Sequence, residues 1–320
     1  MTDISAAGLE FSHLSKRYGE VVALDDMTFD LRHGEVFGFV GGNGAGKTTT
    51  MRIALGVLLA DSGEVRWRGS PVTFENRRRI GYMPEERGLY PKMRVAEQLV
   101  YLARLHGLSV EAARERTAVW TERLGVAARM NDEIQALSLG NQQRVQLASA
   151  LVHDPAVLIL DEPFSGLDPT AVEVMSEVLH EQADTGVPVL FSSHQLDLVE
   201  RISDRVGIVR AGIMVASGTV DELRGTGHEQ LVVDVPDADP AWSRTVPGTS
   251  LLREENGRVL LELDEGLDDQ VVLRAALAAG PVREFARRRP PLTELFRHVV
   301  SVADDDETSA GQPAAGKVDA

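Results

Sequence analysis

The period with which apolar and polar residues alternate differs from one segment of the chain to the next, and it predicts where strands and helices lie. Residues 9–18 and 27–31 alternate between the two kinds, which is typical of half-buried antiparallel strands. Residues 36–40 and 157–160 are apolar throughout, which favours strands buried on both faces. Further strands are predicted at residues 65–72, 80–83, 187–192 and 208–217, and helices at residues 47–59, 138–152, 169–184 and 219–224.

The order of these elements predicts the fold class. Strands alternate with helices, which indicates an α/β domain with a mainly parallel, helix-covered sheet. Residues 95–130 instead have helical periodicity alone, with Leu99, Leu102 and Leu105 on one stripe. We therefore predict an all-helical insert at about residues 92–140.

The pattern restarts after a predicted linker at residues 225–229 and indicates a second domain. Its expected order is β, α, β, β, α, β, with a hairpin turn at Asn256 and Gly257, and this order is typical of a ferredoxin-like α+β unit. We place this accessory domain at residues 226–302, ending in a helix from Leu292 to Val302. The acidic segment 303–320 is predicted to be disordered.

Composition limits the possible functions. A length of 320 residues suits two domains, and no apolar run is long enough to span a bilayer, so any membrane role is predicted to be peripheral. Nothing at the N-terminus is typical of an export signal, which makes the cytosol the expected compartment and a soluble isolated chain the expected form. The net charge of -16 argues against nucleic acid as a partner, because binding it needs a basic face. The absence of cysteine excludes disulfides and thiolate metal sites.

A glycine-rich loop between a predicted strand and a predicted helix matches the phosphate-binding Walker A pattern. Its residues are Gly41, Gly42, Asn43, Gly44, Ala45, Gly46, Lys47 and Thr48, and we include the adjacent Thr49 in the predicted site. Glycines let backbone N–H groups converge on phosphate oxygens, and the helix start adds partial positive charge. Lys47 would neutralise the β- and γ-phosphates, and the Thr48 hydroxyl would ligate Mg²⁺. The loop predicts a nucleoside triphosphate site.

An acidic pair follows the buried strand at residues 157–160. Asp161 can hold Mg²⁺ through water, and Glu162 is placed to accept a proton from an attacking water. Such a pair alone is more often part of a solvated loop. Beside a phosphate-binding loop, it predicts a hydrolytic site in which Lys47 and Glu162 are catalytic.

Residues 137–144 read Leu-Ser-Leu-Gly-Asn-Gln-Gln-Arg. Taken alone, Ser138 would be interpreted as a helix N-cap. The whole segment resembles the signature of ATP-binding-cassette (ABC) proteins, usually Leu-Ser-Gly-Gly-Gln. In that family this helix start binds the γ-phosphate held on the opposite subunit, so the resemblance implies that role for Ser138 and Gly140.

Three further positions resemble ABC motifs in the expected order. Asp168 lies in a segment similar to the D-loop, and His194 follows a strand as the switch histidine does, which the family places against the γ-phosphate and which we count as catalytic. Tyr18 matches the aromatic residue that stacks on adenine. A lone histidine is more often structural, and a strand aromatic more often belongs to the core. The resemblance covers residues 5–225 and implies a P-loop NTPase fold with a mixed sheet, an antiparallel β subdomain and a helical insert.

Leu139 and Asn141 replace the Gly and Gln of the family signature, and one further position also departs from the family pattern. Where the family has a glutamine that contacts Mg²⁺ and the attacking water, this chain has Glu85 after Pro84. A carboxylate can still bind Mg²⁺, but it adds negative charge near the γ-phosphate and donates no hydrogen bond unless protonated. Residues 84–93, the signature variant and the C-terminal domain together resemble a subgroup of bacterial ABC-2-type ATPases. Members of this subgroup work with separately encoded export permeases of the sodium-extrusion and drug-resistance type.

The resemblance implies partners as well as chemistry. A phosphate loop and a signature held apart in one chain would meet only between two copies, which predicts a head-to-tail homodimer with ATP at the interface. The other expected partner is a polytopic membrane permease at the cytoplasmic face, near Glu85 to Met93. A soluble ABC ATPase acting on ribosomes or DNA is the main alternative, and a P-loop regulatory switch is a second one; co-purification with a membrane protein would separate them.

Overall fold

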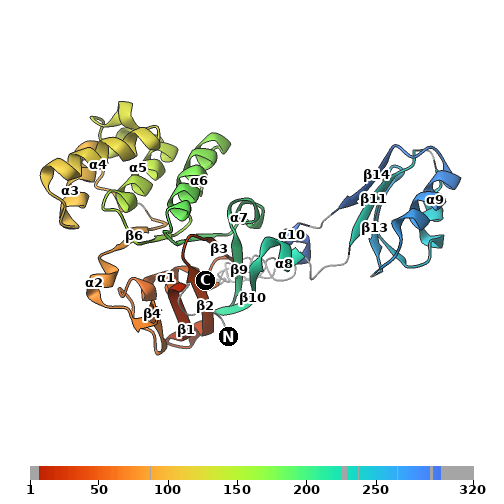
Figure 1. Cartoon of the computed structure of the whole chain (residues 1–320), viewed down its shortest axis with the longest axis horizontal. Coiled ribbons are helices and arrows are strands. Elements are labelled where there is room, and N and C mark those ends of the chain that lie inside the picture. Colours follow the sequence, from red (N-terminus) through yellow and green to blue (C-terminus); the bar gives the residue numbers. More distant parts are fainter. Residues whose placement is uncertain are drawn as a thin grey trace, which may run out of the picture. The chain divides into compact units, whose positions relative to one another are not determined.

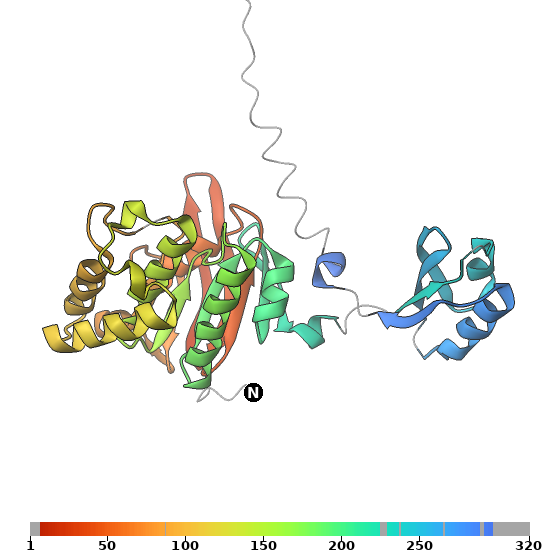
Figure 2. The same ribbon diagram turned by 90° about the horizontal axis from the view of Figure 1, so that it is seen from above.

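The computed structural model describes residues 7–86, 88–224, 229–236, 238–264, 266–288 and 291–296. They form two compact units that divide between Val220 and Asp221 (Figures 1 and 2). The predicted tail at 303–320 and most of the predicted linker lie outside the described residues.

A six-stranded sheet forms the centre of the first unit, in the order β10-β9-β3-β8-β7-β6. The bounds are β3 Val36–Val40, β6 Ile80–Met83, β7 Val157–Leu160, β8 Val189–Ser193, β9 Arg205–Arg210 and β10 Ile213–Thr219. The pairs from β9 to β6 are parallel, and β10 joins antiparallel to β9. Every residue of β3, β7 and β8 is buried, which explains why β3 and β7 have no polar residue, whereas β8 ends in the buried Ser192 and Ser193.

A second, antiparallel sheet has the order β2-β1-β4-β5. Its strands are β1 Ala7–Tyr18, β2 Val21–Arg32, β4 Ser62–Trp67 and β5 Ser70–Pro71, followed by the short helix α2 Phe74–Arg77. Phe29 of β2 stacks on Phe11 and on Phe37 and Phe39 of β3, so the two sheets share one core. Helix α1 (Lys47–Ala54) contributes Met51 to the same core.

Helices gather beside β6 to form the predicted helical segment (Figure 1). They are α3 Val95–Leu105, α4 Val110–Arg123 and α5 Leu139–Leu151, with the short 3₁₀ helices η2 Ala127–Arg129 and η3 Ile134–Ala136 between α4 and α5. Two more helices, α6 Pro169–Asp184 and α7 Leu196–Ile202, precede and follow β8.

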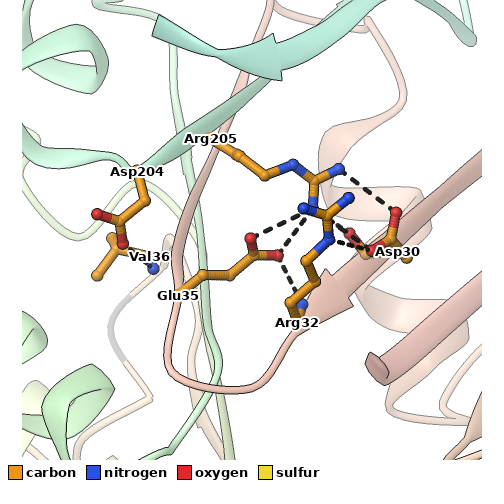
Figure 3. A network of polar contacts seen from close by, with 6 residues as sticks. All are labelled: Asp30, Arg32, Glu35, Val36, Asp204 and Arg205. Atoms are coloured by element: carbon orange, nitrogen blue, oxygen red, sulfur yellow. Dashed lines mark hydrogen bonds and ion pairs between the residues drawn. The ribbon is translucent and has the colours of Figure 1, made fainter. Parts of the chain in front are cut away.

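A buried ion network holds the beginning of β3 (Figure 3). The Arg205 guanidinium on β9 donates to Glu35 Oε1 at 3.0 Å and lies 3.4 Å from Asp30 Oδ1. Asp204 accepts a hydrogen bond from the Val36 N–H at 2.8 Å. Burial raises the pKa of Glu35, although its hydrogen bonds to Arg32 and Arg205 and the Arg205 charge favour its ionised form. Because the glycine-rich loop leaves the other end of β3, this network fixes the strand that carries the loop.

The second unit has the predicted ferredoxin-like plan. Its elements are β11 Gln230–Asp234, η4 Pro240–Thr245, β12 Thr249–Glu255, β13 Arg258–Leu263, α9 Asp269–Ala279 and β14 Glu284–Arg288. The sheet order β12-β13-β11-β14 and its antiparallel pairs are those of a βαββαβ fold, with η4 in place of the first helix. Leu231 and Val233 pack against Val272 and Ala276 of α9 in a separate core.

The structure differs from the predicted elements in two details, and a third prediction is only partly described. The helix expected at 47–59 ends at Ala54, because Gly56 takes a positive φ of 69°. The sequence pattern predicts no helix at the residues that form α7. The helix expected from Leu292 is described only as α10 Leu292–Leu295, and its remainder lies outside the described residues. The short helix α8 Val220–Arg224 agrees with its prediction.

Candidate functional site

The glycine-rich loop depends on glycine for both conformation and space. Gly44 and Gly46 have φ angles of 72° and 108°, a region that other residues rarely enter. A Cβ atom on Gly41 would lie 2.4 Å from the Val209 carbonyl oxygen, and one on Gly46 would lie 2.7 Å from that of Ala23. Larger residues at these positions would therefore displace backbone, and the loop would lose its shape.

This loop lines a cavity of about 420 Å³. The lining residues are Val21, Ala23, Gly42, Asn43, Gly44, Ala45, Gly46, Lys47, Thr48, Thr49, Glu85, Asp161 and Glu162. Residues from β2, from the loop after β3 and from the ends of β6 and β7 thus meet at one place. The volume suits a small-molecule ligand of nucleotide size.

Lys47 is the buried cation of this cavity. Its Nζ donates to the carbonyl oxygens of Gly41 at 2.6 Å and Gly42 at 3.2 Å, and lies 3.6 Å from Glu162 Oε1. An ammonium group in this position can accept an anionic ligand only on the side facing the cavity. The carbonyls and the carboxylate thus orient the charge as well as stabilising it.

Asp161 and Glu162 are joined through one hydroxyl group. Ser192 Oγ donates to Asp161 Oδ1 at 2.6 Å and accepts the Glu162 N–H at 2.8 Å. Glu162 has a φ of 50°, so its backbone turns sharply just after β7. Its Oε2 lies 3.0 Å from His194 Nδ1, while the His194 side chain remains 48% exposed. The carboxylate of Glu162 therefore lies between an ammonium and an imidazole.

The donor set around Asp161 fits a magnesium ion held partly by phosphate. Asp161 is 1% exposed, and among the described residues its Oδ2 has no hydrogen-bond partner. A buried carboxylate oxygen without a partner is costly unless a cation or water completes it. In the part of the chain that the structure describes, no three His, Cys, Asp or Glu side chains are grouped as a metal site. Thr48 and Glu85 line the same cavity and offer further oxygen ligands to a cation.

Six of the predicted site residues are absent from the cavity lining. Gly41 and His194 contact lining residues, Lys47 and Glu162 respectively, whereas Tyr18, Ser138, Gly140 and Asp168 lie away from it. Ser138 and Asp168 cap helices α5 and α6, accepting the N–H groups of Asn141 at 3.4 Å and Ala171 at 2.8 Å. Gly140 is likewise absent from the lining, and Tyr18 at the end of β1 is 49% exposed.

Glu85 lines the cavity from a loop that is tied to the helical segment. The Gln146 side chain of α5 donates to the Pro84 carbonyl oxygen at 2.6 Å. The Tyr90 N–H donates to Gln98 Oε1 of α3 at 3.0 Å. The loop therefore connects the cavity with both helices.

Two contributions to the site were not predicted from the sequence. One is Ser192, which bridges the Asp161 carboxylate and the Glu162 backbone N–H. The signal for it is its position at the carboxyl end of the strand that neighbours the one before Asp161. Val21 and Ala23 also line the cavity. No local pattern distinguishes them from other residues of a hairpin.

Comparison with known proteins assigns both units. Residues 24–165 match the ABC transporter family, and residues 218–300 match the C-terminal domain of DrrA1-3-like ATP-binding proteins. The chain is 38% identical to the uncharacterized ABC transporter ATP-binding protein YhaQ of Bacillus subtilis, over 90% of this chain and 97% of that one. It is 35% identical to the Nod factor export ATP-binding protein I of Burkholderia orbicola, over 75% of this chain and 80% of that one.

Solved structures agree with these matches. The structure of an ATP-binding subunit of an ABC transporter superposes on 68% of this chain and 92% of its own length, with a TM-score of 0.63 and 32% identity. Within the described residues, no helix has both the length and the apolar character needed to cross a bilayer.

Proposed function

The chain belongs to the ABC transporter ATP-binding proteins, and from this membership we propose that the cavity beside β3 is its ATPase site. Proteins of this family hydrolyse ATP to drive transport across a membrane, and this chain is such an ATP-binding subunit. The observation that carries the site assignment is the convergence of Lys47, Asp161 and Glu162 on one cavity of about 420 Å³. The relatives of this chain include an export protein, which favours export as the direction of transport.

The phosphate groups of ATP would lie along residues 42–49. The Gly41 and Gly42 carbonyls hold Lys47, which would lie near the β- and γ-phosphates and neutralise charge on the phosphoryl group that is transferred to water. Thr48 and Asp161 would hold Mg²⁺, which supplies charge neutralisation when bound. Thr49 adds a hydroxyl to the same wall.

Glu162 is proposed as the general base. It lies at the end of β7 with its carboxylate between Lys47 and His194, where it can accept a proton from water beside the γ-phosphate. His194 orients this carboxylate and, being half exposed, can turn toward the phosphate. Ser192 acts as a positioning residue, because its hydroxyl fixes Asp161 and the Glu162 backbone together.

We propose that a second copy completes the site. Ser138 and Gly140 lie outside the lining of the cavity in their own chain, and they would contact the γ-phosphate bound by the other copy in a head-to-tail dimer. Asp168, in the D-loop-like segment, would lie at the same interface. The helix start at Ser138 suits an anion because its N–H groups and dipole point outward. Tyr18 would stack on adenine from its exposed position.

We also propose that the loop carrying Glu85 transmits the nucleotide state to the permease. Because hydrogen bonds join this loop to α5 and α3, the loop would move with the helical segment when ATP binds. Tyr90 and Tyr101 are 54% and 42% exposed, and their rings pack edge to face at 6.3 Å, which offers an aromatic contact at this loop. The permease would thus bind here and hold the chain at the cytoplasmic face of the membrane. The net charge of -16 supports the absence of nucleic acid among the partners.

The substitution Glu162→Gln tests the assignment. It keeps the size of the side chain but removes the base, so hydrolysis is expected to fall about 1,000-fold while ATP binding measured by calorimetry persists. Glu115→Gln, at an exposed position of α4, is the matched control and should hydrolyse normally. Wild-type turnover in Glu162→Gln would reject Glu162 as the base.

A further inference from the structure

A hairpin places Tyr18 next to the lining of the proposed ATP cavity. Strand β1 ends at Tyr18 and β2 begins at Val21, with Gly19 at a φ of 58° in the turn between them. Tyr18 and Val21 are cross-strand partners, and Val21 lines the cavity. Tyr18 itself is 49% exposed, so its ring lies beside the cavity lining and outside the apolar core.

A cation lies over the ring of Tyr18. The Nζ atom of Lys16, two residues earlier on β1, lies 5.9 Å from the centroid of that ring. A separation of up to about 6 Å lets an ammonium group be attracted to the π-electrons of an aromatic ring. Because the ammonium group lies over one face of the ring, a flat ligand could stack only on the opposite face.

Lys16 is itself held in place by Asp61. The Lys16 Nζ donates to Asp61 Oδ1 at 2.7 Å, and Asp61 Oδ2 accepts the Arg17 N–H at 2.8 Å. The Asp61 N–H donates to the Ser15 carbonyl oxygen at 2.9 Å, so the residue just before β4 is attached to β1 through both its side chain and its backbone. The hydrogen bond from Lys16, followed by that from Arg17, lowers the pKa of Asp61. Only 14% of the Lys16 side chain is exposed, so its ammonium group has a fixed position beside the half-exposed ring.

We propose that Lys16 and Asp61 position the Tyr18 ring to stack on the base of the nucleotide. An exposed tyrosine side chain has several rotamers, and a ligand that stacks on it loses affinity by immobilising one of them. The Lys16 ammonium group restricts the ring before the nucleotide binds, so less affinity is lost. This inference rests on the proposed stacking of Tyr18 on adenine, and it adds the two residues that hold the ring.

The role of Lys16 is confined to ligands that carry a base. The phosphate groups would lie along residues 42–49, where Lys47 supplies the positive charge. The Lys16 ammonium group is already paired with the Asp61 carboxylate and therefore offers little net charge to a phosphate. ATP and inorganic triphosphate should consequently respond differently to the loss of Lys16.

Calorimetric titration of the full chain with ATP and with inorganic triphosphate, both in the presence of Mg²⁺, tests the proposal. Lys16→Met keeps an unbranched side chain but removes the ammonium group, so ATP affinity should fall about fivefold while triphosphate affinity stays unchanged. Lys16→Arg keeps a cation beside the ring and should bind ATP like the wild type. Arg17→Met is the matched control, because it removes the same charge from the adjacent residue, whose guanidinium donates to the Glu20 carbonyl oxygen at 3.4 Å; its affinities should not change.

A second variant distinguishes the positioning role from the stacking role. Tyr18→Leu should lower ATP affinity about tenfold, and adding Lys16→Met to it should have no further effect, because the ring that Lys16 positions is gone. Wild-type ATP affinity in Tyr18→Leu would overturn the stacking of Tyr18 and this inference together. If Tyr18→Leu binds ATP weakly, the stacking stands, and the role of Lys16 alone is overturned by any of three results: wild-type ATP affinity in Lys16→Met, an equal loss of triphosphate affinity, or a full additional loss in the double variant.

Discussion

The two units of this chain bury different kinds of side chain. In the first unit, Lys47, Asp161 and Glu162 are each less than a tenth exposed, as are Glu35 and Arg205. In the second unit, the buried polar side chains among the described residues are the uncharged Gln230 and Ser243, and the ion pairs lie at the surface. The first unit buries charged side chains, whereas the described part of the second unit carries them at its surface.

This difference teaches where function lies in each unit. Burying charge is unfavourable unless partners surround it, so a buried charged cluster requires many positioned neighbours. In the first unit those neighbours form the cavity. The second unit has an apolar core that needs no such arrangement, and its chemistry is confined to its surface. Arg287 is an example, because its guanidinium contacts Glu229 and Asp269 and the pKa of Asp269 is lowered by that hydrogen bond.

The strongest test of the comparison removes the buried cation of the first unit. Lys47→Ala leaves Glu162 without its ammonium partner and the phosphates without their charge, so ATP affinity should fall about 1,000-fold, or about 4 kcal/mol. Calorimetric titration with ATP measures this, and unfolding of the second unit should not change. Lys92→Ala removes an exposed lysine as the control. Unchanged ATP affinity in Lys47→Ala would refute the phosphate-loop assignment.

The converse test weakens the apolar core of the second unit. Leu261→Ala opens a cavity in that core and should lower its stability by about 3 kcal/mol, while ATP affinity stays unchanged. Differential scanning calorimetry would follow the two unfolding transitions. Leu277→Ala, 60% exposed on α9, should change stability by less than about 0.5 kcal/mol. If Leu261→Ala abolished ATP binding, the two units could not be treated as independent.

A smaller expected effect is the pH dependence of the stability of the first unit. His153 stacks on His106 with ring centroids 3.7 Å apart, and burial, followed by the nearby His106, lowers the pKa of His153 from 6.5 to about 4. The pKa of His153 is lower in the folded state than in the unfolded state. The contribution of His153 to the stability of the first unit is therefore complete above pH 6.5 and is lost as the pH falls toward 4. The first unit should lose on the order of 2 kcal/mol of stability over this interval.

Unfolding measured as a function of pH checks this expectation. His153→Gln should flatten the pH dependence of the first transition, whereas His180→Gln, at an exposed position of α6, should leave it unchanged. Residues 229–296 contain no histidine, so the second transition should lack this contribution. An unaltered pH profile in His153→Gln would contradict the assignment.

The local sequence pattern was sufficient to predict most of the helices and strands. The apolar runs predicted β3 and β7 at their observed bounds, because a strand buried on both faces has no polar residue to interrupt it, and β6 also lies at its predicted residues. Asn256 and Gly257 both take positive φ, as the hairpin prediction requires. Helix α7 escaped prediction because only two turns separate its ends, too few for a periodic pattern to be distinguished.

The sequence by itself determined the chemistry of this protein: glycines where the loop needs them, Lys47 at the phosphates, and Asp161 and Glu162 after a buried strand. The tertiary structure decided how those groups are held. Ser192 joins the Asp161 carboxylate to the Glu162 backbone N–H, and Arg205 joins Glu35 across 170 residues of sequence. Such contacts arise only when strands distant in the chain become neighbours in one sheet, and no local pattern of residues encodes that pairing.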